Sequence, residues 1–155
     1  MKMDAIDKEI LLAIQENANL PLAQISKRVG ISVTPCWNRI KKMEENKIIL
    51  GRCTLLNRKE VNLPIIVFLS ISVSSHSHDW TIKFSQVVNK HNEIIEVHRL
   101  TGSDADYVLK VVARTVEDYD AFQQRLIGEL EFVKMSSSIS LQEIKQTYAL
   151  PLDQV

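Results

Sequence analysis

The sequence predicts an α+β chain with two parts, a winged helix-turn-helix over residues 1–56 and a ferredoxin-like βαββαβ domain over residues 65–155. Two helical patterns joined by a glycine between Leu22 and Asn46 predict the first part. Alternating strand-type and helix-type patterns after Pro64 predict the second part. We expect residues 57–64 to form a linker, because proline does not fit a central strand.

The composition is that of a globular protein, with 45% hydrophobic and 25% charged residues among 155. No apolar run reaches the roughly 18 residues that a membrane helix needs. Acids occupy the N-terminal segment MKMDAIDKEI, where a signal peptide would be apolar, so we expect a cytoplasmic protein without membrane contact. Cys36 and Cys53 cannot form a disulfide framework, and we expect both to be small buried hydrophobes.

Charge is distributed unevenly along the chain. Residues 1–60 hold 11 Lys and Arg against 7 Asp and Glu, whereas residues 61–155 hold 8 against 12. The net charge of the whole chain is zero. A basic first part and an acidic second part predict that only the first part meets a polyanion.

Three helices are predicted in the first part. Apolar spacing and early acids place a helix over Asp4–Asn17, and a second helix covers Leu22–Val29. Gly30 follows the second helix, where a C-terminus favours a residue that tolerates positive φ. Thr34 is the expected N-cap of the third helix, with Pro35 at its first position.

The third helix is expected to bury Cys36, Ile40 and Met43 on one face and to expose basic and amide side chains elsewhere. A helix with such an outer face after a glycine turn is typical of a DNA-binding helix-turn-helix. The alternative is a plain αα-hairpin with a solvated basic face. Short strands at Ile48–Leu50 and Arg52–Leu56 are predicted to form the wing.

The second part shows the element order β-α-β-β-α-β. This order predicts a four-stranded antiparallel sheet with helices on one face, and the other face is apolar enough to need a second copy of the chain. The predicted elements are strand Ile65–Val73, helix Trp80–His91, strands Ile94–Leu100 and Asp106–Ala113, helix Val116–Leu130 and strand Phe132–Leu141, followed by a tail to Val155.

Four segments carry a resemblance to a known family. They are DAIDKEILLAIQENANLPLAQISKRVGIS, TPCWNRIKKMEENKII, TGSDADYVLKV and QTYALPL. Their order on this architecture resembles the Lrp/AsnC family, the feast/famine regulators, over essentially the whole chain. One departure is that three residues, rather than two, separate Gly102 from Asp106.

The resemblance implies a cytosolic bacterial or archaeal transcriptional regulator, not an enzyme, that binds double-stranded DNA sequence-specifically and responds to a small amino acid. It also implies homodimers built on back-to-back sheets, often assembled into octamers. Two alternatives stay open. One is an architectural protein that wraps DNA with little sequence preference. The other is a small-molecule-binding or catalytic ferredoxin-like domain with an incidental helix-turn-helix.

Residues at the third helix and the wing are the candidates for DNA binding. Basic side chains would neutralise phosphates, whereas Asn38 can bond adenine and the Thr34 methyl can contact thymine. Two alternatives concern single residues: Arg39 pairs with an acid such as Glu16, and Trp37 packs against the wing. The full predicted set is Ser32, Thr34, Pro35, Trp37, Asn38, Arg39, Lys41, Lys42, Lys47 and Arg52.

The turn around Gly102 is the candidate effector site. Its backbone N–H groups can bind a carboxylate, and Asp104 or Asp106 can bind an ammonium. The last strand would contribute hydroxyls from a neighbouring subunit. The alternative is that Gly102 only makes the bend and the acids are solvated. The full predicted set is Thr101, Gly102, Ser103, Asp104, Asp106, Tyr107, Ser136, Ser137 and Ser138.

Catalytic and metal sites find no support in the sequence. His76 and His78 lack a third ligand at a telling spacing, and no nucleophile-and-base motif or P-loop is present. We therefore expect no catalytic residue, no metal and no cofactor apart from the amino-acid effector.

Overall fold

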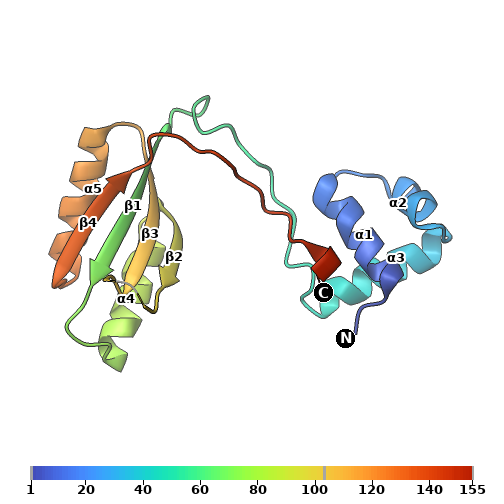
Figure 1. Cartoon of the computed structure of the whole chain (residues 1–155), viewed down its shortest axis with the longest axis horizontal. Helices are drawn as coiled ribbons and strands as arrows, with labels where there is room; N and C mark the ends of the chain where they lie inside the picture. The colour runs from blue at the N-terminus through green and yellow to red at the C-terminus, as the bar shows by residue number, and fades with distance from the viewer. Residues whose placement is uncertain (1, 103, 155) are drawn as a thin grey trace. The chain divides into compact units, whose positions relative to one another are not determined.

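The chain forms two compact units in the computed structural model, which describes residues 2–102 and 104–154 (Figure 1). The helical unit comprises Met1–Leu55 and Lys145–Val155, and the sheet unit comprises Leu56–Ile144. From the sequence we expect the tail to belong to the second domain. In the structure the tail belongs to the helical unit, because Gln15 exchanges hydrogen bonds of 2.7 and 3.2 Å with the backbone of Leu150.

The first helix, α1 (Ala5–Glu16), begins at a reciprocal cap. The Asp4 carboxylate accepts a bond of 2.9 Å from the Asp7 N–H, and the Asp7 carboxylate accepts one of 3.1 Å from the Asp4 N–H. This is a capping box built from two aspartates, and it satisfies N–H groups that the first helical turn leaves without partners.

The next two helices are α2 (Leu22–Val29) and α3 (Val33–Glu45). Gly30 joins them with φ of 71°, as its predicted role requires. The predicted N-cap at Thr34 is wrong, because α3 begins at Val33 and follows Ser32, whose side chain makes no capping bond. Pro35 therefore lies within the first turn, where its missing N–H still has no intrahelical partner to lose.

The core of the helical unit contains Ile10, Ile25, Cys36, Ile40 and Met43, so the predicted inner face of α3 is confirmed. The tail adds to this core through Leu152 in a short 3-10 helix, η1 (Leu152–Gln154). Burial of apolar side chains supplies the main stabilisation of such a three-helix unit. The expectation of a second buried cysteine is wrong, because Cys53 is exposed.

The predicted wing strands do not form within the chain. Residues 46–57 contain no β-bridge, and Leu50, Leu55 and Leu56 are 88%, 68% and 66% exposed. A two-stranded ribbon is marginal in water unless an apolar face packs on something. Since these leucines contact no core, the ribbon lacks the burial that would hold it.

The sheet unit contains four antiparallel strands in the order β2-β3-β1-β4. Every predicted element is present, with bounds that differ from the prediction by two residues or fewer. The bounds are β1 (Ile65–Ser72), α4 (His78–Lys90), β2 (Ile94–Arg99), β3 (Tyr107–Ala113), α5 (Val116–Glu129) and β4 (Lys134–Ile139).

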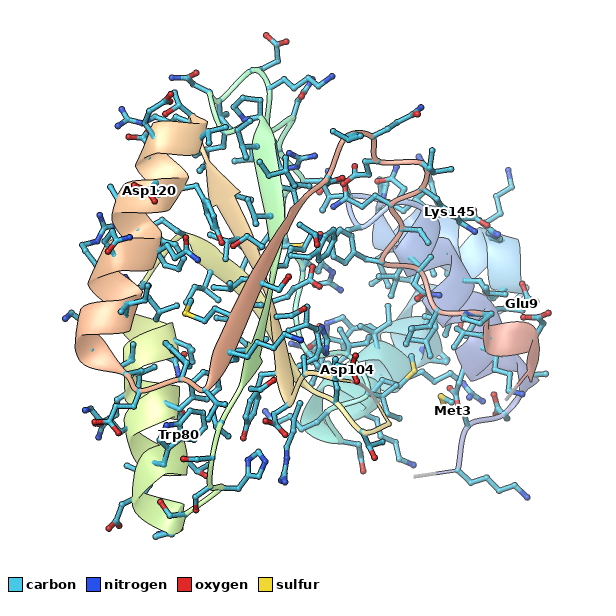
Figure 2. All side chains as sticks on the ribbon, turned by 60° about the vertical axis from the view of Figure 1, so that its left-hand side comes forward. Met3, Glu9, Trp80, Asp104, Asp120 and Lys145 are labelled. Carbon is cyan, nitrogen blue, oxygen red and sulfur yellow. The ribbon has the colours of Figure 1, made fainter. Side chains whose placement is uncertain are left out.

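Helices α4 and α5 cover one face of the sheet, as Figure 2 shows. The core between them contains Val67, Leu69, Leu109 and Phe122, all at most 1% exposed. No helix in the described part of the chain is both long and apolar enough to span a membrane.

The face of the sheet opposite α4 and α5, here called the outer face, is more mixed than the sequence suggested. An apolar strip contains Ile66, Phe68, Val108 and Val112. A charged pair interrupts it, because Lys110 on β3 lies opposite Phe68 and pairs with Glu96 on β2 at 2.9 Å. The Lys110 hydrogen bond is the main cause of the lowered pKa of Glu96, with a smaller contribution from His98.

Candidate DNA-binding surface and effector pocket

One face of α3 is open to solvent and carries most of the predicted DNA-binding residues. Thr34, Trp37, Asn38 and Lys41 are exposed at spacings of three, one and three residues, opposite the buried Cys36. Trp37 is 49% exposed, and the Lys41 ammonium lies 5.8 Å from the centre of its ring. The alternative that Trp37 packs against a wing is therefore excluded, because no wing strands form.

Arg39 is turned away from this face. Its guanidinium contacts the Asp4 and Asp7 carboxylates, each at 2.7 Å, and Asp7 is buried. The hydrogen bonds to Asp7 and then Asp4 raise the pKa of Arg39. The alternative of an internal ion pair is thus confirmed with different acids, since Glu16 pairs with Arg28. Arg39 holds α3 against the start of α1.

The remaining basic candidates lie at the surface beyond the centre of α3. Lys41 contacts Glu44 at 3.1 Å, and Arg52 contacts the same carboxylate at 3.6 Å. Lys42 and Lys47 are exposed. Such surface ion pairs contribute little to stability, so Lys41 and Arg52 can exchange Glu44 for a DNA phosphate at a small cost in free energy. Ser32 and Pro35 are exposed at the beginning of α3 and complete the predicted set.

The turn between β2 and β3 is positioned from its base. The Leu100 N–H donates to the Asp106 carbonyl at 2.8 Å, and the Asp106 N–H donates to the Ile71 carbonyl at 2.9 Å. Gly102 has φ of 73°, and no atom lies within 4 Å of the place where a Cβ would be. Thr101 is exposed, and the predicted Ser103 lies outside the described residues.

Asp106 is engaged inside the sheet unit. Its carboxylate accepts a bond of 2.8 Å from the Val73 N–H and lies 3.1 Å from His76 Nε2. The Val73 bond and then His76 lower the pKa of Asp106. Tyr107 is buried, with its hydroxyl 3.4 Å from His76 Nδ1. Both residues fasten the loop after β1 to the turn.

Asp104 instead borders a cavity of about 210 Å³ on the sheet unit. The turn carries Asp104 away from the helix-covered face (Figure 2). The cavity's floor comes from the outer face, where β1 and β4 pair Ser70 with Ser136 and Ser72 with Lys134. The Ser72 hydroxyl donates to the Asp104 carbonyl at 2.9 Å, which links floor and turn. The lining residues are Ser70, Ser72, Asp104, Ala105, Lys134 and Ser136.

The three consecutive serines of β4 are divided between the faces of the sheet. Ser136 lines the cavity, and Ser138 pairs with Phe68 on the outer face without lining it. Ser137 points to α5, where its hydroxyl lies 2.6 Å from that of Tyr119. Of the three predicted serines, only Ser136 therefore lies at the cavity. It lies beside the turn of its own chain, whereas the prediction took it from a neighbouring subunit.

Four lining residues, Ser70, Ser72, Ala105 and Lys134, were missed from the sequence. The available signal was the period-two pattern, since Ser70 and Ser72 share one face of β1, and Lys134 and Ser136 share one face of β4. The pairing of β1 with β4 at this register is what joins the two pairs. Residue spacing along one strand cannot supply that register.

Comparisons with known families agree with this geometry. The model described as Lrp/AsnC ligand binding domain matches residues 66–150, which span the sheet unit and part of the tail. The model described as winged helix-turn-helix DNA-binding matches residues 3–49, which contain all three helices. The chain belongs to the Lrp/AsnC family. The helix-turn-helix match ends before most of the predicted wing.

Similar proteins from this family span the whole chain. The HTH-type transcriptional regulator Zrp of Zymomonas mobilis is 38% identical over 153 residues, with 99% of both chains covered. The crystal structure of an AsnC family transcriptional regulator from Agrobacterium tumefaciens is 44% identical, with a TM-score of 0.93 and coverage of 98% of this chain and 99% of that one. The transcriptional regulator NMB0573 of Neisseria meningitidis in complex with L-Met is 31% identical, with a TM-score of 0.92 and 99% of each chain covered.

These findings establish a helix-turn-helix followed by an α+β ligand-binding domain with a four-stranded antiparallel sheet. The named relatives are transcriptional regulators, and the matches indicate no catalytic family.

Proposed function

We propose that this chain regulates transcription by binding specific DNA sequences and that a small amino acid controls the binding. The observation that carries the proposal is the open face of α3. Thr34, Trp37, Asn38 and Lys41 are exposed there, while Arg39 and the core hold the other side of the helix. A rigid helix with a solvent-facing polar surface can enter the major groove.

The residues of this surface divide into two roles. Lys41, Lys42, Lys47 and Arg52 bind phosphates, which supplies affinity for any sequence. Asn38 and Thr34 lie in the first half of α3, which approaches base edges in a helix-turn-helix complex. Asn38 can pair bidentately with adenine, and this contact supplies sequence discrimination.

The test compares a duplex selected in vitro from a random pool with an unselected random duplex, using fluorescence anisotropy at fixed salt. Lys42→Ala should weaken both complexes equally and lower the salt slope by about one unit. Asn38→Ala should weaken the selected complex by about 1–3 kcal/mol more than the random one. Lys8→Ala, on α1, is the matched charge control.

A wild-type protein that binds the selected and random duplexes equally would favour the architectural alternative. Failure to bind either duplex would favour the incidental helix-turn-helix. An unchanged selected-to-random ratio for Asn38→Ala would remove that residue from base recognition while leaving the regulator itself in place.

The effector is proposed to bind at the cavity beside the Gly102 turn. The family match to a ligand-binding domain and the L-Met bound to the Neisseria regulator support a small amino acid. A cavity of about 210 Å³ is smaller than the usual sites for drug-sized molecules, which suits such a ligand. Thermal unfolding with each of the twenty amino acids tests this, because a ligand that binds the folded state raises the unfolding midpoint.

Homodimerisation is proposed through the apolar strip of the outer face, which α4 and α5 leave uncovered. Such a dimer would bind a pseudo-palindromic operator, and dimers could assemble into octamers in the cytoplasm. Phe68 is 42% exposed on this strip. Phe68→Glu should reduce the mass of the full-length protein measured by light scattering. Ile82→Glu, at a 45% exposed position on α4, should not. A monomeric wild-type protein at micromolar concentration would exclude the dimer.

A further inference from the structure

We infer that the cavity beside the Gly102 turn selects an amino acid with an anionic side chain, and that Lys134 is the residue that selects it. This inference rests on the proposed function, since it names the chemical class of the effector. It follows from the composition of the cavity wall, from the register of two strands and from the unpaired charges at its rim.

The wall of the cavity is more polar than apolar. Three serines, one lysine and one aspartate line it, and Ala105 supplies the only methyl group among the described lining residues. An aliphatic side chain would lose little water-exposed surface there, so it would gain little binding free energy. A carboxylate side chain would instead find an ammonium and several hydroxyl donors.

The strand register determines how these donors are arranged. Ser70 lies opposite Ser136, and Ser72 lies opposite Lys134, so four side chains occupy adjacent positions on two paired strands. Neighbouring strands are about 5 Å apart, and two residues along a strand span about 7 Å. A floor of that size fits one small amino acid. Ser72 is partly committed through its bond to Asp104, which leaves Ser70, Ser136 and Lys134 to face a ligand.

The charges of Lys134 and Asp104 have no ion-pair partner in the described part of the chain. Among the described residues, no acid lies within 4.0 Å of the Lys134 ammonium and no basic group within 4.0 Å of the Asp104 carboxylate. By contrast, Lys41, Lys90 and Lys110 each pair with a glutamate.

This arrangement matches the charges of a dicarboxylic amino acid. Its ammonium would pair with Asp104, and its side-chain carboxylate would pair with Lys134. The α-carboxylate would then accept from the Ser70 and Ser136 hydroxyls. All three charges of the ligand would have partners, as burial of charged groups demands. An amide side chain would keep the hydrogen bonds but lose the ion pair with Lys134.

A second cavity, of about 520 Å³, provides the competing site. It lies between the end of α5 and the start of β4, and it is lined by Ile127, Leu130, Glu131, Phe132, Val133, Lys134 and Met135. Its mostly apolar wall would suit leucine or methionine. It shares Lys134 with the first cavity but contains neither the turn nor the serines, so Ser136 and Val133 separate the two sites experimentally.

The experiment is isothermal titration calorimetry of the full-length protein with five probes: L-aspartate, L-glutamate, L-asparagine, L-glutamine and L-leucine. We expect one of the two acids to bind at least tenfold more tightly than its matching amide. Lys134→Gln should remove this preference while leaving the affinity for the amide nearly unchanged. Lys83→Gln, at an exposed position on α4, should retain the wild-type preference.

Two variants locate the binding site. Ser136→Val should weaken binding of the preferred acid, whereas Val133→Asn, a neutral polar change in the second cavity, should leave it unchanged. The inference would be overturned if leucine, asparagine or glutamine bound most tightly, or if Lys134→Gln kept the preference for the acid. In either case an amino acid still binds, so the proposed effector response stands. Absence of binding by all twenty amino acids would overturn the effector proposal together with the inference.

Discussion

The open face of α3 and the cavity on the sheet unit are both polar surfaces, but they present charge in opposite ways. On α3 the basic groups point outward along a convex helix, with Lys41 and Lys42 in the second half of it. In the cavity, Lys134 and Asp104 converge with serine hydroxyls on one small floor. An outward array suits the repeated phosphates of a polymer, whereas converging opposite charges suit a small zwitterion.

Each surface also has a charged neighbour that looks functional in the sequence but serves the fold. Arg39 lies between Asn38 and Ile40 on α3, yet it bonds Asp4 and Asp7. Asp106 follows the Gly102 turn, yet it bonds Val73 and His76. Arg39 and Asp106 differ from the charged residues beside them because a partner from another element of the chain bonds their side chains. The predictions below use that difference.

Arg39→Met should give the largest effect, and it should be an effect on stability. Removal of the guanidinium leaves the buried Asp7 carboxylate without its charged partner, at a cost of roughly 1.5–3 kcal/mol in the free energy of unfolding. Urea unfolding can follow the helical unit in a Trp80→Phe background, because Trp37 is then the single tryptophan.

Lys42→Met is the control for this measurement, because Lys42 is exposed on the same helix and should change the unfolding free energy little. If Arg39→Met unfolds like the wild type but loses DNA affinity, Arg39 contacts phosphate and its internal ion pairs are incidental.

Asp104→Asn and Asp106→Asn should separate the two candidate acids of the turn. The Asp104 carboxylate has no basic partner among the described residues, so it is available to the effector. Asp104→Asn should therefore weaken effector binding about tenfold, or by about 1.4 kcal/mol. Asp106→Asn should retain effector affinity and lower the unfolding midpoint. Calorimetry with the tightest-binding amino acid checks both. The opposite pattern, with affinity lost only in Asp106→Asn, would assign the ammonium to Asp106.

Most of the fold could be predicted from the sequence because apolar periodicity is a local property. Ile10 and Ile14 on α1, Ile25 on α2 and Met43 on α3 each belong to an apolar pattern that indicates a helix, whether or not the packing of the helices is known. The wing could not be predicted in this way. A pattern can favour strands at Ile48–Leu50, but only tertiary contacts make a ribbon stable, and the chain provides none.

The site was predicted less completely, because its members meet through pairing between distant segments. Asp104 was predicted from one turn and Ser136 from a run of serines, and both line the cavity. Lys134 was missed, since its neighbour across the sheet, Ser72, is fixed only by the β1–β4 register. The contact of the tail with Gln15 could not be predicted either, because it depends on two side-chain bonds that have no sequence pattern.

Ser137→Ala and Ser136→Ala should separate the two faces of β4. Ser137→Ala loses the bond to the buried Tyr119, so the free energy of unfolding should fall by about 1 kcal/mol with effector affinity unchanged. Ser136→Ala should instead weaken effector binding and leave stability nearly unchanged, since its side chain faces the cavity. Urea denaturation of both variants measures the change in unfolding free energy, and calorimetry measures the change in effector affinity. Equal effects of both variants on affinity would mean that the strand register does not define the site.

The smallest expected effect is the dependence on pH of the stability that Asp106 contributes through its contacts with Val73 and His76. The Val73 N–H and then His76 hold the pKa of Asp106 below its ordinary value of 3.8. A carboxyl whose pKa is lower in the folded state stabilises the fold fully above its unfolded pKa. That contribution is lost as the pH falls through the lower folded value. The unfolding midpoint of the wild type should therefore exceed that of Asp106→Asn at about pH 6, and the gap should narrow below about pH 4.

Trp80 fluorescence can report this unfolding transition in a Trp37→Phe background, because the centre of its ring lies 5.6 Å from the ring centre of Tyr107, the residue next to Asp106. The other acids titrate in both proteins, so the difference between the wild type and Asp106→Asn isolates Asp106. Asp104→Asn, in the same turn, is the matched substitution control. A gap for Asp106→Asn that stays constant down to about pH 3 would mean that the charge of Asp106 does not stabilise the turn.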